Sequence, residues 1–208
     1  MVLDALRDEI DPLLSKVAKI VIKINPDVLT WLALLSSIIA GVLFYYSSET
    51  KGVYLLLASL FVFINGLLDA LDGKVAKLTK KSNPRGDFLD HALDRYADVF
   101  IVGGLSLSKW CDLRIGFFAI VGMLLTSYMG TQAQAVGYRR VYKGLLGRAD
   151  RLVLLMIIPI LQYSLLQYQI TTLWRFTLLE WLLLYIAIVG NITAIQRFYY
   201  ILNMLKRQ

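Results

Sequence analysis

The chain of 208 residues has little charge and almost no cysteine or histidine: charged residues make up 18%, and Cys111 and His91 are the single residues of their types. One cysteine excludes an internal disulfide. Repeats and low-complexity segments are absent, and a second domain has no room. The remainder is apolar, since hydrophobic residues make up 58% of the chain and the mean hydropathy is +0.62. These values exceed those of a soluble domain of this size and indicate a membrane protein.

Six apolar stretches are long enough to cross a hydrocarbon core of about 30 Å, which takes roughly 20 residues per helix. They are residues 28–48, 53–76, 87–108, 114–136, 151–170 and 175–202. The prediction is an all-α integral membrane protein, one domain over residues 1–208, with a six-helix bundle over residues 28–202. Ahead of it, apolar residues recur at helical spacing among acids and bases. This pattern predicts an amphipathic interfacial helix over residues 1–24.

Lysine and arginine are unevenly distributed over the connections. Both terminal segments and the second-to-third and fourth-to-fifth connections are rich in them, whereas the other connections hold only Lys51, Lys109, Arg114 and Arg175. The positive-inside rule therefore predicts a multi-pass protein of the cytoplasmic membrane with both termini on the cytoplasmic side. Nucleic-acid binding is not expected despite a net charge of +7, because the bases lie on one membrane side without a stacking platform.

Four aspartates flank the polar interruption between the second and third stretches. Asp69 and Asp72 are three residues apart and Asp90 and Asp94 four apart, so each pair lies on one face of its helix. A carboxylate at membrane depth costs about 2.5–3.5 kcal/mol, so four of them need a compensating cation or a water-filled cavity, and a metal ion is the natural candidate. Oxygen ligands suit Mg²⁺, Mn²⁺ or Ca²⁺ rather than zinc, and two such ions commonly serve displacement at phosphorus.

The spacing of this segment resembles the signature of the CDP-alcohol phosphotransferase family. The matching positions are Asp69, Asp72, Gly73, Ala76, Gly86, Asp90 and Asp94. One position departs from the family pattern, because Lys77 stands where arginine is usual and a lysine lacks the planar fork that holds phosphate bidentately. Thr30, in Asn-Pro-Asp-Val-Leu-Thr, resembles the family's Pro-Asn-x-x-Thr entry to the first span, with Asp27 replacing asparagine.

The resemblance implies transfer of a substituted phosphate from a CDP-linked lipid donor to an alcohol hydroxyl, with release of CMP. It implies that Asp69, Asp72 and Asp90 hold one Mg²⁺ or Mn²⁺ ion on the CDP pyrophosphate and that Asp90 and Asp94 close a second site. Asp94 is the expected general base. The nucleotide is expected to contact Asp69, Gly73, Ala76, Lys77, Gly86 and Thr30. A homodimer in contact with membrane lipids is also implied.

The acceptor is predicted to be a phosphorylated polyol. Arg148 and Arg151 resemble an element of phosphatidylinositol-phosphate synthases and their archaeal relatives in which arginines hold the acceptor phosphate. Those synthases also place bases soon after a Ser-Tyr pair, and none follows Ser127 and Tyr128 here. Glycerol phosphate is therefore the first expectation and inositol phosphate the alternative.

Blander interpretations remain for some of these residues. Arg148 and Arg151 would be plain interfacial anchors if the acceptor carried no phosphate. His91 is expected to point away from the metal face, because one residue turns a helix by about 100°. A divalent-cation transporter would also use membrane carboxylates, but it would need them in mid-bilayer.

Overall fold

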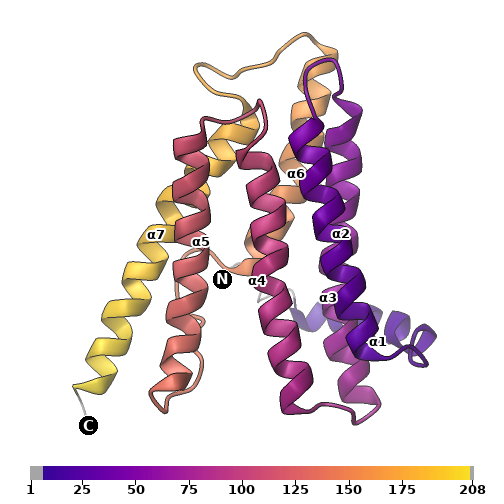
Figure 1. Cartoon of the computed structure of the whole chain (residues 1–208), viewed down its shortest axis with the longest axis vertical. Helices are drawn as coiled ribbons and strands as arrows, with labels where there is room; N and C mark the ends of the chain where they lie inside the picture. Colours follow the sequence, from indigo (N-terminus) through magenta and orange to yellow (C-terminus); the bar gives the residue numbers. More distant parts are fainter. Residues whose placement is uncertain (1–6, 207–208) are drawn as a thin grey trace.

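The structure is a computed structural model that describes residues 7–206, and within that range it contains seven α-helices and no strand (Figure 1). The helices are α1 (Arg7–Ile20), α2 (Pro26–Tyr46), α3 (Val53–Leu78), α4 (Pro84–Ser106), α5 (Leu113–Ala135), α6 (Arg148–Gln167) and α7 (Leu178–Leu205). Each predicted span begins and ends within three residues of a helix. The prediction of an all-α fold is confirmed.

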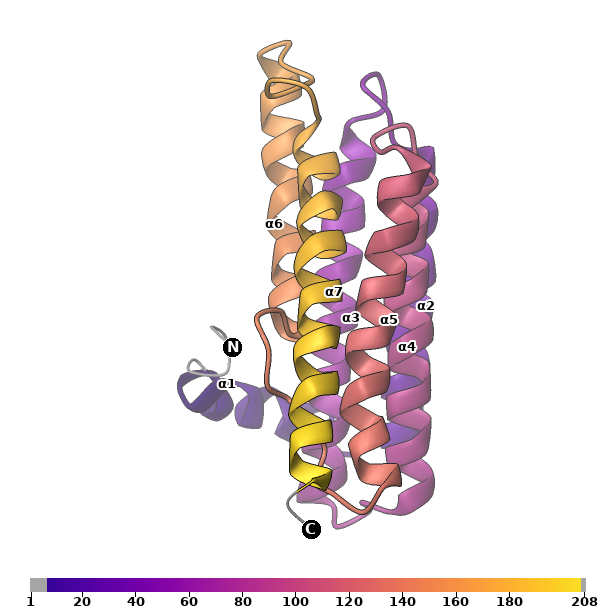
Figure 2. The same ribbon diagram turned by 90° about the vertical axis from the view of Figure 1, so that its left-hand side faces the viewer.

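The six long helices run along the long axis of the molecule, and α1 lies across their lower end (Figures 1 and 2). α2 packs against α3 and α4, α5 packs against α7, and α6 bridges α3 and α7. One apolar cluster, drawn from every long helix, fills the space between them. The lower half carries the C-terminal part of α3 and the N-terminal part of α4, which hold the aspartates, and α6 begins at the upper edge of this half (Figure 1).

Five of the helices, α2, α3, α5, α6 and α7, are long and apolar enough to cross a membrane. α4 has comparable length, 23 residues, but its first four turns carry four aspartates and Arg95. The composition therefore confirms a membrane protein with several spans. A sixth crossing by α4 stays a prediction.

α1 covers the central part of the predicted amphipathic helix, and residues 1–6 of that prediction lie outside the described residues. Its buried Ala18 packs with Leu71 and Val75 of α3. An ion pair of 2.6 Å between Asp11 and Lys74 adds a polar contact between the same two helices. α1 is therefore attached to the segment of α3 that carries the motif aspartates.

Local sequence determines where α2 and α4 begin. The side-chain oxygens of Asn25 and Asn83 accept hydrogen bonds from the backbone of Asp27 (3.1 Å) and Gly86 (2.9 Å), and a proline occupies the first helical position of each helix. Asparagine at the N-cap and proline after it are the preferred residues for a helix start. Arg85 and Asp27 pair at 2.9 Å and join the two starts. The motif helix α4 is thereby aligned with α2.

Glycine allows α2 and α4 to approach until their backbones touch. A Cβ built on Gly104 would overlap the backbone of Gly41, and one built on Gly41 would overlap the carbonyl of Phe100. Gly103, the neighbour of Gly104, has no heavy atom within 4 Å of such a Cβ. Of the two adjacent glycines of α4, Gly104 is therefore needed for the close backbone contact with α2, and Gly103 is not.

We expect Gly104→Ala to destabilise the protein by about 1–3 kcal/mol, because the added methyl forces the two backbones apart. Gly103→Ala is the matched control, since it brings the same gain in helix propensity without a clash. Thermal unfolding of the two variants in detergent measures the difference. Equal melting temperatures would show that the α2–α4 contact is not limiting.

Candidate functional site

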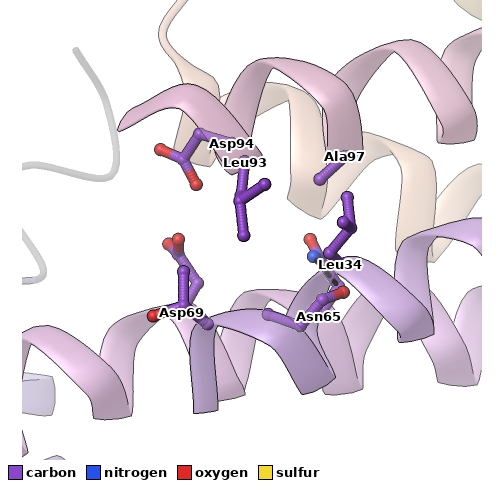
Figure 3. A pocket seen from close by; sticks show the side chains of 8 residues that line it. Leu34, Asn65, Asp69, Leu93, Asp94 and Ala97 are labelled. Atoms are coloured by element: carbon purple, nitrogen blue, oxygen red, sulfur yellow. Dashed lines mark hydrogen bonds between the residues drawn. The ribbon is translucent and has the colours of Figure 1, made fainter. Parts of the chain in front are cut away.

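Asp69 of α3 and Asp94 of α4 face each other across a small pocket at the lower end of the bundle (Figure 3). Thr30 of α2 lines the same pocket. The remaining lining residues are Ala33, Leu34, Asn65, Leu93 and Ala97. Three residues predicted for the site, from three different helices, thus meet in one place.

Asp72 lies one turn beyond Asp69 and is the most deeply buried of the four motif aspartates. It is 4% exposed, and its Oδ2 atom has no hydrogen-bond partner. Its electrostatic neighbours include Thr30, Asp69 and Asp90. A buried carboxylate oxygen without a donor is costly, and a cation is the partner that would remove the cost.

Asp90, His91 and Asp94 form a group of potential metal ligands whose donor atoms all lie within 4.8 Å of one another. The expectation that His91 points away differs from the structure, where its Nδ1 atom lies 3.5 Å from Asp90. Its Nε2 atom lies 2.7 Å from Arg140 and 3.6 Å from Asp87. The imidazole therefore lies between the aspartate cluster and the connection that precedes α6.

Arg148 occupies the space between the two motif helices. Its Nη1 atom donates to Asp69 at 2.7 Å, its Nη2 atom lies 2.8 Å from Asp94, and its Nε atom lies 3.4 Å from Asp98. The predicted phosphate ligand is thus bonded to both predicted metal helices. Asp94 also lies within hydrogen-bonding reach of Asp69, so Arg148 bridges two carboxylates that are close to each other.

Asp98 is the anchor of a buried ion network one turn above Asp94. It is 4% exposed and pairs with Arg151 at 2.8 Å and with Arg95 at 3.4 Å. Arg151 is itself 3% exposed, so this pair is shielded from solvent. Arg95 also contacts Asp94, at 3.4 Å, and donates to Ser127 of α5. The network ties α4, α5 and α6 together next to the pocket.

Of the residues predicted for nucleotide contact, Thr30 is buried in α2, and the others lie along α3 and at the start of α4. Gly73 and Lys77 are exposed and Ala76 is half-buried, and a Cβ on Gly73 would meet nothing within 4 Å. Gly86 lies in the first turn of α4, close to Asp27. The surface beside Asp69 therefore has open space over a helix backbone, where a phosphate chain can approach closely.

Arg197 is a buried cation that the sequence prediction counted only among the topology-determining charges. It is 6% exposed in α7 and donates to the backbone carbonyls of Thr126 (2.7 Å), Tyr142 (3.0 Å) and Lys143 (2.8 Å). A carbonyl carries only partial charge, so these bonds orient the guanidinium without neutralising it. Its position within an apolar helix was the signal that could have identified it.

Four arginines from four segments gather around the Ser127 turn of α5. The electrostatic neighbours of Arg197 include Arg95, Arg140 and Arg151. Arg140, in the α5–α6 connection, lies with its guanidinium 5.4 Å from the ring centre of Tyr142. This group of cations, next to the aspartates, is suited to bind an anion.

The opposite end of the bundle has a different character. A hollow of about 520 Å³ lies there among the helix connections, lined by residues that include Glu49, Lys109 and Trp110. Cys111 lies at the same end, and burial together with the charge of Glu180 raises the pKa of its thiol to about 12. None of the predicted site residues lines this hollow.

The donor set at the lower end fits hard divalent cations. Carboxylate oxygens predominate, one buried oxygen of Asp72 lacks a partner, and Asp90, His91 and Asp94 already lie at a spacing suited to an ion. Oxygen-rich sets of this kind suit Mg²⁺ or Mn²⁺. The arrangement thus combines carboxylates suited to a cation, an open face beside them and a neighbouring group of arginines.

Comparison with known proteins places this geometry in a family. The sequence model for CDP-alcohol phosphatidyltransferase matches residues 23–193. An archaetidylinositol phosphate synthase of Methanothermobacter thermautotrophicus is 30% identical over 201 residues, which cover 97% of this chain and 92% of that protein. The archaetidylinositol phosphate synthase of Pyrococcus horikoshii is 27% identical over 157 residues, 74% of this chain and 80% of that protein.

Solved structures support the fold. The phosphatidylinositol phosphate synthase of Mycobacterium tuberculosis with CDP-DAG bound superimposes with a TM-score of 0.68 over 91% of this chain and 94% of that chain. The same protein with manganese and citrate gives a TM-score of 0.71, over 90% of this chain and 88% of that chain. The identity of 22% makes this a likeness of fold.

We expect Asp98→Asn to destabilise the protein by about 3–5 kcal/mol, because it leaves the buried Arg151 without its carboxylate. Asp87→Asn removes a carboxylate from the same helix whose side chain is 73% exposed, and it should cost far less. Thermal unfolding in detergent compares the two variants. A similar loss in both would mean that the Asp98 network contributes little to the fold.

Proposed function

Because the chain belongs to the CDP-alcohol phosphatidyltransferase family, we propose that this membrane enzyme transfers a lipid-bearing phosphate from a CDP-linked lipid to a hydroxyl of inositol phosphate. The acceptor oxygen attacks the phosphorus that carries the lipid. The pyrophosphate bond breaks, CMP leaves with the bridging oxygen, and the acceptor proton passes to a base. The observation that carries the proposal is the meeting of the motif aspartates with a cluster of arginines at one end of the bundle.

For the donor, the exposed face of α3 beside Asp69 is the proposed nucleotide surface. Gly73 leaves room over the helix backbone, and Lys77, exposed one turn further along, supplies a positive charge to the phosphates. Ala76 and Gly86 complete this surface, with Thr30 at its inner edge. The structural relative from M. tuberculosis was solved with CDP-DAG, which supports a CDP-lipid as the donor class.

For the metal, Asp69, Asp72, Asp90 and Asp94 are the proposed ligands of two Mg²⁺ or Mn²⁺ ions. When bound, the ions polarise the phosphoryl group and stabilise the leaving CMP. The unpartnered oxygen of Asp72 and the spacing of Asp90 and Asp94 support this set. The M. tuberculosis relative was solved with manganese. His91 lies beside Asp90 and Asp94 and is not itself a proposed ligand.

Asp94 is the proposed general base. It lies on the pocket wall opposite Asp69 and is also next to Arg95, which belongs to the arginine cluster. A hydroxyl whose phosphate is held by those arginines therefore lies near Asp94. Proton removal by a placed carboxylate typically contributes 10²–10⁴-fold to a rate.

For the acceptor, the names of the relatives favour inositol phosphate. The first expectation from the sequence was glycerol phosphate. That expectation rested on the lack of a base after Ser127 and Tyr128. In the structure, bases reach the same turn from other helices: Arg95 donates to Ser127, and Arg197 donates to the carbonyl of Thr126. We propose that these arginines and Arg140 hold the acceptor phosphate.

Arg148 and Arg151 take different parts in this proposal. Arg148 is 19% exposed and bonds Asp69 and Asp94, which line the pocket, so it is available to a phosphate. Arg151 is buried against Asp98, which argues against the direct phosphate contact that the sequence analysis gave it. Its proposed role is to hold Asp98 in place.

The site is proposed to face the cytoplasm, because the lysines and arginines of both termini and of the α3–α4 and α5–α6 connections lie at the same end. Soluble acceptors and CMP would be exchanged there. A single domain over residues 1–208 and a homodimer remain part of the proposal on the family resemblance.

The direct test is CMP release by the purified protein from ester- and ether-linked CDP-lipids, crossed with inositol phosphate, glycerol phosphate, inositol, serine and glycerol. We expect turnover with inositol phosphate and loss of activity on chelation of divalent ions, restored by Mg²⁺ or Mn²⁺. Asp69→Asn is the inactive control. Preference for an unphosphorylated alcohol would contradict the arginine site, and full activity in excess chelator would contradict the metal site.

We expect Arg140→Ala to raise the KM for inositol phosphate about ten- to a hundredfold, which corresponds to losing one hydrogen bond between charged groups. The KM for the CDP-lipid should barely change. Arg139→Ala is the matched control, because Arg139 is exposed in the same connection. Steady-state kinetics separates the two constants. An unchanged acceptor KM in Arg140→Ala would remove this residue from the phosphate site.

A further inference from the structure

We propose that the guanidinium of Arg148 and the divalent ions are alternative partners of Asp69 and Asp94. Ion binding would displace Arg148 from the two carboxylates and leave its charge available for the acceptor phosphate. Arg148 would then couple the occupancy of the metal site to the formation of the anion site. This inference rests on the metal ligands of the proposed function.

The geometry makes simultaneous occupancy unfavourable. Arg148 places one nitrogen 2.7 Å from Oδ2 of Asp69 and another 2.8 Å from Oδ1 of Asp94, and these carboxylates face each other across the pocket (Figure 3). Ions of this class take carboxylate oxygens at about 2.0–2.6 Å. An ion on those oxygens would place like charges in contact within a site of low dielectric. One cation must leave.

The side chain of Arg148 can move away from its carboxylate partners, whereas that of Arg151 is held in place. Arg148 is the first residue of α6, follows Gly147 and is 19% exposed, so its long side chain can turn without disturbing helical hydrogen bonds. Its third contact, to Asp98, is long at 3.4 Å. Arg151 lies one turn further in, is 3% exposed and bonds Asp98 at 2.8 Å. The ion pair of Asp98 with Arg151 therefore stays intact while Arg148 moves.

The destination of the released charge follows from its surroundings. Arg95 and Arg151 adjoin Asp98, and both are electrostatic neighbours of Arg197, which is oriented by carbonyls alone in its hydrogen bonds. A released Arg148 adds one more positive charge beside this group. An anion stabilises that arrangement, and the phosphate of the acceptor is the anion the proposed reaction supplies. The metal thus prepares the acceptor site through one side chain.

Substrate-free Mn²⁺ binding, measured from the electron paramagnetic resonance signal of free Mn²⁺ over detergent-solubilised protein, tests the competition. We expect Arg148→Ala to bind Mn²⁺ at least about tenfold more tightly than the wild type, because the competing hydrogen bonds are gone. Lys74→Ala is the control, since it removes a cation from an ion pair at the same end but outside the cluster. It should leave the affinity within about twofold.

Chemical modification tests the displacement itself and separates it from a general charge effect. Phenylglyoxal, which reacts with free guanidinium groups, should modify Arg148 several-fold faster with Mn²⁺ than without, as followed by peptide mass spectrometry. Arg151 should stay protected in both conditions. If tighter Mn²⁺ binding in Arg148→Ala came only from removing a positive charge, the modification rate in the wild type would not change with Mn²⁺, and the proposal would be overturned.

Asp69→Asn distinguishes failure of this inference from failure of the proposed function. Loss of Mn²⁺ binding in Asp69→Asn, together with unchanged affinity in Arg148→Ala, would reject the competition and keep the metal ligands. Wild-type affinity in Asp69→Asn would reject Asp69 as a ligand, and the competition with it.

Discussion

The cost of placing charge among packed helices determines how the lower end of this protein is organised. Asp69, Asp72, Asp94 and Asp98 lie in a bundle whose core is largely apolar, and an isolated carboxylate there would be expensive. Arginines from α4 and α6 supply the compensation through a chain of ion pairs. The position of α6 relative to α3 and α4 is therefore set by charge as much as by apolar packing.

That chain of ion pairs has two layers with different properties. The inner pair, Asp98 with Arg151, is shielded from solvent and has a short N···O distance of 2.8 Å, so its role is structural. The outer contacts of Arg148 involve partly exposed carboxylates that a metal can also use. One network thus holds the helices together through its inner pair and, on the proposal above, exchanges partners through its outer contacts.

The helices and the aspartate motif were predictable from sequence, because both rest on local patterns. Apolar run length gives each of the six long helices to within three residues, and fixed spacing identifies the family. The acceptor side was not predictable in the same way. The cations of the proposed acceptor site come from α4, α7 and the α5–α6 connection, and only folding brings Arg95 and Arg197 to the turn at Ser127. The predicted orientation of His91 differed because a flexible ring at the edge of a helix follows its charged neighbours rather than the helical angle alone.

The attachment of α1 to α3 has a further consequence for how this enzyme meets its lipid. Ala18 packs with Leu71 and Val75, which lie on either side of Asp72 and Gly73 in the sequence. The depth of α1 in the membrane therefore fixes the depth of the carboxylates. An amphipathic helix settles at the level of the lipid headgroups. α1 would then keep the carboxylates at the depth of the lipid headgroups. The nucleotide of a CDP-lipid lies at this depth while the lipid chains stay in the hydrocarbon core. The donor would reach the site by lateral diffusion alone, without being lifted out of the bilayer.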